Sequence, residues 1–175
     1  GDRVRHLTPV LSALDDGSAS LFTDTGARLT TPRRAFGGAR LNGRYYLVGG
    51  MRGDFQIVDS CEVFDFETQQ FTPIAAPEQP RLSPELVAMG GKLYLAGGSS
   101  PKADGDGLEE NRSVEVYDPE TDTWTRLIDE LPVSTRHMHM FADRGQLLFA
   151  TTNTDGKRLI HVLRTNPHTT TNHTR

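Results

Sequence analysis

The chain has 175 residues, enough for one domain or a large part of one. Its formal net charge of −4 provides no basic field for nucleic acid phosphates and no polybasic anchor for anionic membranes, so neither is an expected partner. Seventeen glycines and ten prolines accompany an apolar content of 35%, which is typical of many short strands joined by tight turns. We therefore expect an all-β protein.

The sequence does not determine the cellular compartment of the protein. Cys61 is the single cysteine, so no disulfide within the chain is expected, and its place in an apolar segment indicates packing rather than reactivity. No apolar run is long enough to cross a bilayer, and the first residues lack the pattern of a secretion signal. We expect either a cytoplasmic protein or an exported one whose signal has been removed, with export slightly favoured.

In chain order, three segments predict a hairpin between the last two strands of a repeated unit. In each segment, two large apolar residues stand seven positions apart with polar turn residues between them. The pairs are Phe22 and Leu29, Phe64 and Phe71, and Tyr117 and Trp124. We expect the last two pairs to pack between neighbouring sheets.

A second pattern predicts the first two strands of each unit. Residues 43–50, GRYYLVGG, and residues 91–98, GKLYLAGG, have the same layout 48 positions apart, a period typical of four-stranded propeller repeats. The double glycine that ends each copy is expected to mark a bulge or a close backbone approach, not a phosphate site. Tight turns are predicted at Asn42-Gly43, Gly90-Gly91 and Arg144-Gly145.

The third copy of the unit departs from this pattern. Thr151-Thr152 stands in place of the double glycine, and Leu163 stands in place of the tyrosine. The pattern therefore gives weak support to an outer strand in this copy. The tail at residues 166–175 has no large apolar residue and is expected to be a loop or a frayed extension.

A double glycine after an apolar strand, an aromatic residue after a variable loop and a tryptophan-like residue seven positions later resemble kelch repeats. The resemblance implies a β-propeller of four-stranded antiparallel blades. It divides the chain into the end of a partial blade at residues 1–31, kelch blades at 32–79 and 80–130, a divergent kelch-like blade at 131–165 and a polar tail at 166–175.

This division supplies about three blades, whereas propellers typically close with four to eight. The two end pieces cannot be joined into one regular blade, because both supply a third strand. We therefore predict an incomplete ring, which further chain or partner subunits complete.

The resemblance also implies where a ligand binds, since kelch loops at one mouth of the ring contact partners. The matching ligand-binding positions follow the proline of each repeat, at Arg33, Arg34, Arg81, Ser83, Arg136 and His137. If the four arginines converge, their planar guanidinium groups favour an acidic peptide or a carboxylated sugar. The alternative is that they are solvated or salt-bridged arginines at strand ends.

Two further clusters contain side chains that can bind metal ions, the histidines at 137 and 139 and the carboxylates of residues 102–111. Strand alternation puts His137 and His139 on one face, but a metal site needs a third ligand, so packing is favoured. Residues 102–111 hold four carboxylates, but they fail the EF-hand pattern, so a solvated, mobile loop is favoured over a calcium site. We expect no metal and no cofactor.

No nucleophile with an adjacent base can be recognised in the sequence. We therefore expect a kelch-type module without catalytic activity of its own, which binds a protein partner or an acidic or carbohydrate ligand. The alternative is part of a propeller enzyme acting on a carbohydrate, sugar-isomerising or oxidase-like. A sugar enzyme would use arginine and carboxylate at the ring mouth, for which Arg34, Arg136 and Glu85 are the candidates.

Overall fold

A computed structural model describes residues 26–164 of the chain. The predicted strand around Phe22 and the polar tail at 166–175 lie outside the described residues. Within residues 26–164 there are thirteen strands and no helix, so no described helix is long and apolar enough to cross a membrane. The expectation of an all-β chain is confirmed.

The strands form three larger sheets and one hairpin, all with antiparallel neighbours. The first sheet has the order β1 (Gly37–Leu41), β2 (Arg44–Val48), β3 (Cys61–Asp65) and β4 (Gln70–Ile74). The second sheet has the order β5 (Glu85–Met89), β6 (Lys92–Ala96), β9 (Val114–Asp118) and β10 (Thr123–Ile128). The third sheet has the order β11 (His139–Asp143), β12 (Gln146–Thr152) and β13 (Arg158–Arg164). The hairpin consists of β7 (Ser99–Pro101) and β8 (Leu108–Glu110).

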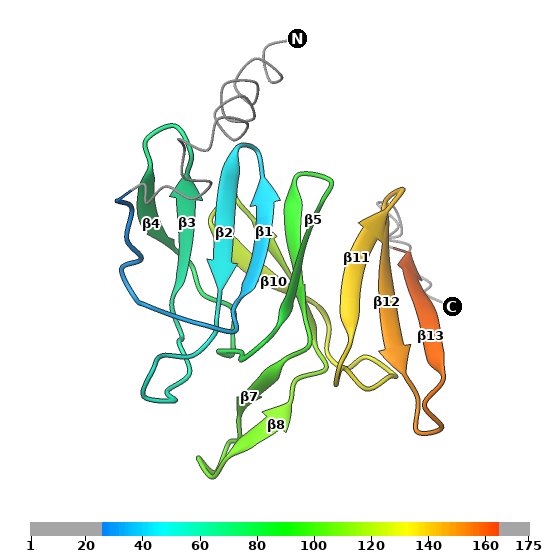
Figure 1. Cartoon of the computed structure of the whole chain (residues 1–175). Helices are drawn as coiled ribbons and strands as arrows, with labels where there is room; N and C mark the ends of the chain where they lie inside the picture. The colour runs from blue at the N-terminus through cyan, green and yellow to red at the C-terminus, as the bar shows by residue number, and fades with distance from the viewer. Residues whose placement is uncertain (1–25, 165–175) are drawn as a thin grey trace, which may run out of the picture.

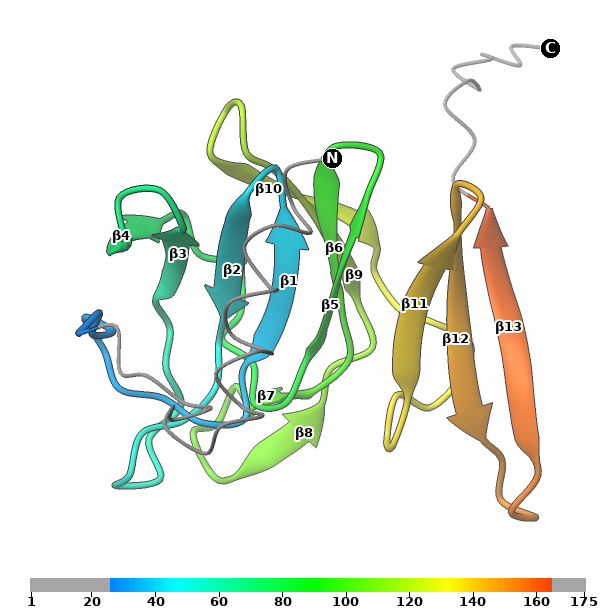
Figure 2. The same ribbon diagram turned by 45° about the horizontal axis from the view of Figure 1, so that its top comes forward.

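The three sheets stand side by side, and the second lies between the other two (Figures 1 and 2). One apolar cluster joins the facing sides of the first and second sheets, with Tyr46, Val63, Leu93 and Leu95 among its buried members. Another joins the second and third sheets, with Ala96, Val114, Leu147 and Phe149 among its members. The core of this fold therefore lies between sheets, as in a propeller.

The predicted tight turns are present, because their residues adopt the positive φ that two-residue hairpins need. Asn42 and Gly43 have φ of 49° and 75°, and Arg144 and Gly145 have 48° and 73°. Gly90 and Gly91 repeat this geometry between β5 and β6. The first two strands of every sheet are thus joined as the sequence predicted.

The double glycines end their strands because the backbone passes close to a neighbouring unit. A Cβ atom on Gly49, whose φ is 68°, would lie 2.2 Å from the carbonyl oxygen of Arg81. In the third sheet, Thr151 and Thr152 extend β12 to seven residues, whereas β2 and β6 have five each. The prediction of close backbone approach is confirmed.

The aromatic pairs meet across the last two strands of their sheets. Tyr117 lies opposite Trp124 with ring centroids 5.0 Å apart, between the first and second sheets. Phe64 lies opposite Phe71 at 4.8 Å, but this pair is half-buried on the outer face of the first sheet, which no described sheet covers. The expected packing between sheets is therefore observed for the first pair only.

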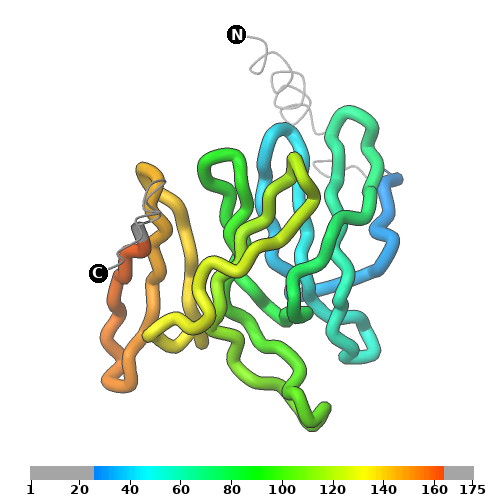
Figure 3. Tube along the Cα trace, turned by 180° about the vertical axis from the view of Figure 1, so that it is seen from behind, coloured from blue at the N-terminus to red at the C-terminus, as the bar shows by residue number. Residues whose placement is uncertain are grey.

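The outer face of the third sheet also has no neighbouring sheet among the described residues. Phe141, Leu148 and Val162 lie side by side on it, and Phe141 and Val162 are exposed. The stack is open at both ends within residues 26–164, and the view from behind shows the same arrangement (Figure 3). This agrees with the predicted incomplete ring.

Candidate functional site

The longer connections of all three sheets gather at one end of the stack, the lower end in Figure 1. We call this end the loop face. It contains the connections that leave the second strand of each sheet, at residues 49–60, 97–113 and 153–157, and those that enter the first strand, at 31–36, 79–84 and 131–138. The short hairpin turns lie at the opposite end (Figure 1).

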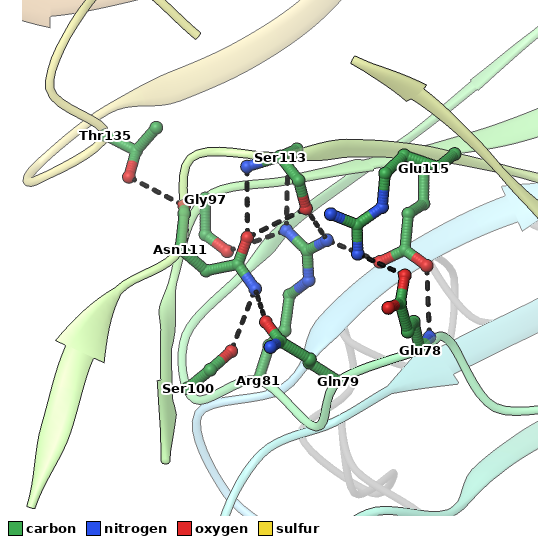
Figure 4. Close-up of polar contacts among 10 residues, drawn as sticks. Glu78, Gln79, Arg81, Gly97, Ser100, Asn111, Ser113, Glu115 and Thr135 are labelled. Atoms are coloured by element: carbon green, nitrogen blue, oxygen red, sulfur yellow. Dashed lines mark hydrogen bonds and ion pairs between the residues drawn. The ribbon is translucent and has the colours of Figure 1, made fainter. Parts of the chain in front are cut away.

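Arg81 does not face solvent at the loop face, because its side chain is fully buried. Figure 4 shows its guanidinium between Gly97, Ser113 and Glu115. Nη2 donates to Glu115 Oε2 at 2.5 Å and to Ser113 Oγ at 2.8 Å, while Nη1 donates to the carbonyl oxygens of Gly97 and Ser113. Burial lowers the pKa of Arg81, and the Glu115 carboxylate opposes that shift.

Arg33 repeats this arrangement in the first sheet. Its buried Nη2 lies 2.7 Å from Glu62 Oε2, and Nη1 donates to the carbonyl oxygens of Gly49 and Ser60. Burial alone would raise the pKa of Glu62, but hydrogen bonds from Thr30 and Thr31 and the charge of Arg33 outweigh it, so this pKa is lowered. Both guanidinium groups are therefore used inside the protein, in the salt-bridged arrangement that was the alternative expectation for these arginines.

Among the described residues, the third sheet has no such ion pair at its loop end and instead contacts the β7–β8 hairpin. Thr135 takes the place of Arg33 and Arg81, counted from the tight turns of each sheet. Glu110 of β8 accepts hydrogen bonds from the backbone N–H and hydroxyl of Thr135 and from the hydroxyl of Ser134. Burial alone would raise the pKa of Glu110, but these hydrogen bonds outweigh it and hold the pKa below its ordinary value.

A groove of about 470 Å³ opens at the loop face between the second sheet and the turn before β11. Three predicted ligand-binding residues line it, namely Ser83, Arg136 and His137. Three carboxylates line it too, at Glu85, Glu109 and Glu110. The structure therefore brings half of the predicted residues together, in a groove whose walls hold more carboxylates than guanidinium groups.

Equivalent turns present these residues in each unit. Ala35, Ser83 and His137 occupy the same position and have φ of 53°, 51° and 55°. The N–H of Ser83 donates to the carbonyl oxygen of Ala35 at 2.8 Å, which joins the first turn to the second. The residues beside these positions, Arg34 and Arg136, are both exposed.

Arg34 lies outside the groove lining, at the loop that follows β2. Its guanidinium carbon is 5.0 Å from the ring centroid of Phe55, an exposed residue that belongs to no motif in the sequence. The only signal for Phe55 in the sequence was an aromatic residue inside a polar, glycine-containing loop. Of the residues named for a sugar enzyme, Glu85 and Arg136 share the groove and Arg34 does not.

The expected mobile loop at residues 102–111 is partly a strand. Residues 108–110 form β8 and pair with β7, so the insertion is a hairpin, and only its tip is a turn. Glu109 and Glu110 therefore have fixed places in the groove wall. The expectation of a loop is wrong for residues 108–110, because they pair with β7, whereas residues 102–109 are solvent-exposed as expected.

The histidine pair is divided by the start of β11. His137 lies in the turn and His139 begins the strand, yet both are exposed while Met138 and Met140 are buried, as strand alternation predicted. Within residues 26–164, no three His, Cys, Asp or Glu side chains group as a metal site would require. Burial raises the pKa of Cys61 to about 11, which keeps this thiol protonated near neutral pH.

Face-to-face antiparallel sheets with their longer loops at one end define the class, a repeat-built segment of a β-propeller. The family model of the kelch motif matches residues 32–77 and 80–127, together more than half of the chain. The chain therefore belongs to the kelch repeat family, a family of protein-binding repeats.

Individual relatives agree with this assignment. The chain is 32% identical over 123 residues to the F-box/kelch-repeat protein At1g67480 of Arabidopsis thaliana, a match covering 70% of this chain and 31% of that protein. It is 30% identical over 108 residues to Kelch-like protein 41a of Danio rerio, covering 60% of this chain and 18% of that protein. The solved structure of YjhT matches with a TM-score of 0.60 at 22% identity, covering 69% of this chain and 34% of that chain, which supports the fold alone.

The chain spans about a third or less of the length of these relatives. The two open sheet faces fit this difference in length.

Proposed function

We propose that this chain is the part of a protein-interaction module that binds a protein partner at its loop face, with no catalytic activity of its own. The observation that carries this proposal is the groove of about 470 Å³, which collects Ser83, Arg136 and His137 from two units. Its walls combine apolar and polar side chains, and concave surfaces of this kind are typical binding sites.

The charge of the groove shapes the expected partner. Glu110 is engaged by Ser134 and Thr135, and Glu85 lies near His139, with 3.4 Å between a carboxylate oxygen and Nδ1. An acidic ligand, which four converging arginines would favour, is supported only by the two exposed arginines, Arg34 and Arg136. Of these, Arg136 already lies 3.8 Å from Glu110, measured from Nε to Oε2. We propose that the partner is a protein segment rather than a carbohydrate, because kelch repeats bind proteins.

Site-specific photo-crosslinking tests this function. A photoreactive residue at His137 should give specific protein adducts in an extract, whereas the same residue at Asn42, an exposed turn at the opposite end, should not. Glu109→Trp, which places a large side chain in the groove from β8, should abolish the adduct. Adducts of equal strength from both ends, or an adduct that survives Glu109→Trp, would contradict the proposal.

A further inference from the structure

The loop between β2 and β3 contains a tight hairpin whose sequence does not suit its geometry. The N–H of Arg52 donates to the carbonyl oxygen of Gln56 at 2.9 Å, and the N–H of Phe55 donates to that of Arg52 at 3.1 Å. Phe55 closes this turn with a φ of 66°. Turns of this type usually carry glycine at that position, since a residue without Cβ adopts positive φ at no steric cost.

The corresponding hairpin of the third sheet follows that rule. The N–H of Asn153 donates to the carbonyl oxygen of Lys157, and that of Gly156 donates to Asn153, with Gly156 at a φ of 76°. The β7–β8 hairpin also closes on a glycine, Gly105, at a φ of 77°. A bulky residue at positive φ is an outlier, and such outliers cluster at functional sites.

Folding does not account for Phe55 either. Its side chain is 74% exposed, the most exposed large apolar residue among residues 26–164. It belongs to neither of the apolar clusters between the sheets. The backbone of Phe55 is therefore strained, and no packing of its side chain in a core offsets that strain.

Arg34 completes the feature. Its backbone N–H and carbonyl pair with Met51 at 2.9 Å each, which holds Arg34 beside the hairpin, and its guanidinium lies over the Phe55 ring. Arg52 is paired with Asp54 at 2.8 Å, whereas no carboxylate is paired with Arg34 among the described residues. An aromatic ring with an unpaired guanidinium above it has the composition of interface hot spots, which are enriched in aromatic residues and arginine.

We propose that Phe55 and Arg34 form an anchor for a protein segment in which an apolar side chain stands next to a carboxylate. This inference rests on the proposed function and names the partner chemistry at the first unit of the loop face. The ring contacts the apolar side chain, and the guanidinium binds the carboxylate through charge-assisted hydrogen bonds.

A library of random peptides displayed on phage, selected on the whole chain, tests the anchor. Selected peptides should place Asp or Glu beside a large apolar residue. Phe55→Asn, which tolerates positive φ, should weaken their binding at least about tenfold, and Arg34→Gln about fivefold or more. The melting temperature of Phe55→Asn should equal or exceed that of the wild type, because the strain is relieved.

The chain provides a matched control. Phe66 is 49% exposed and follows β3 at the opposite end of the first sheet. The guanidinium carbon of Arg40 lies 5.5 Å from its ring centroid. Phe66→Asn and Arg40→Gln should leave peptide binding within about twofold of wild type, since these residues lie away from the loop face.

Each contrary result has a distinct meaning. Loss of binding in Glu109→Trp together with unchanged binding in Phe55→Asn would overturn the anchor and leave the proposed function standing. Selection of lysine-rich peptides, or a lower melting temperature for Phe55→Asn, would also overturn the anchor. Failure to select any peptide would overturn both the anchor and the proposed function. Selected peptides that bind Phe55→Asn and Glu109→Trp as tightly as the wild type would also overturn both.

Discussion

The second and third sheets carry equivalent side chains on equivalent faces, yet these side chains have opposite surroundings. Val114 pairs with Ala96 on the second sheet and is 0% exposed, because the third sheet covers it. Ile160 pairs with Ala150 at the same position of the third sheet and is 57% exposed. The difference shows that the neighbouring sheet, not the residue type, determines burial in this stack.

The same two sheets also differ in how their loop ends are held. The second sheet has a buried ion pair of its own, between Arg81 and Glu115. The third sheet has Thr135 and His161 at the matching places and depends on Glu110, which the β7–β8 hairpin between β6 and β9 supplies. The third sheet is therefore structurally dependent on its neighbour, and the second is not dependent in this way.

The largest expected effect comes from removing one partner of the buried ion pair. Glu115→Ala should lower the free energy of unfolding by about 3–5 kcal/mol, because it leaves the Arg81 charge buried and uncompensated. His161→Ala, at the matching place, should cost less than about 1.5 kcal/mol, since it loses one hydrogen bond with Thr151. Denaturant unfolding measures both, and equal costs would remove the contrast between the sheets.

A second comparison concerns the double glycine. Gly49→Ala should cost on the order of 3 kcal/mol, since it adds strain at positive φ and a clash with the Arg81 carbonyl oxygen. Thr151→Ala, at the equivalent position of β12, should cost only about 1 kcal/mol. The extended strand accepts alanine there, so the change removes only the hydrogen bond between the Thr151 hydroxyl and His161. Thermal unfolding checks both, and a tolerated alanine at Gly49 would contradict the close approach.

The exposed face of the third sheet gives the most direct test of the incomplete ring. Val114→Ala should cost about 1.5–3 kcal/mol, because it removes buried methyl groups. Ile160→Ala should change the free energy of unfolding of the isolated chain by no more than about 0.5 kcal/mol. A cost at Ile160 as large as that at Val114 would show that this face is already covered in solution.

The smallest expected effect concerns Glu110 and pH. The pKa of this carboxyl is lowered in the fold from an ordinary value of 4.5, so its contribution is fully present above that value and is lost as the pH falls through the folded pKa. Wild type should exceed Glu110→Gln by about 1 kcal/mol near pH 7, allowing for partial exposure. Thermal unfolding at several pH values checks this, and a difference that grows in acid would contradict it.

Local chemistry in the sequence was enough to determine the repeating elements. The hairpin turns need positive φ, which Asn42-Gly43 and Gly90-Gly91 supply, and the aromatic pairs sit at the spacing of a strand hairpin. Each of these features depends on residues within one unit, and each recurs, so alignment of the copies revealed it. The all-β fold and the kelch family followed from the sequence for this reason.

Only the tertiary structure decided which polar residues at the loop face remain available. Arg33 and Arg34 are adjacent, yet the first is buried against Glu62, twenty-nine positions away, and the second is exposed beside Phe55. Sequence spacing gives the side of a strand on which a residue lies, but not the distant group that pairs with it. Burial and pairing also depend on how separate units pack together, and the groove, which residues of two units line, exists only after that packing.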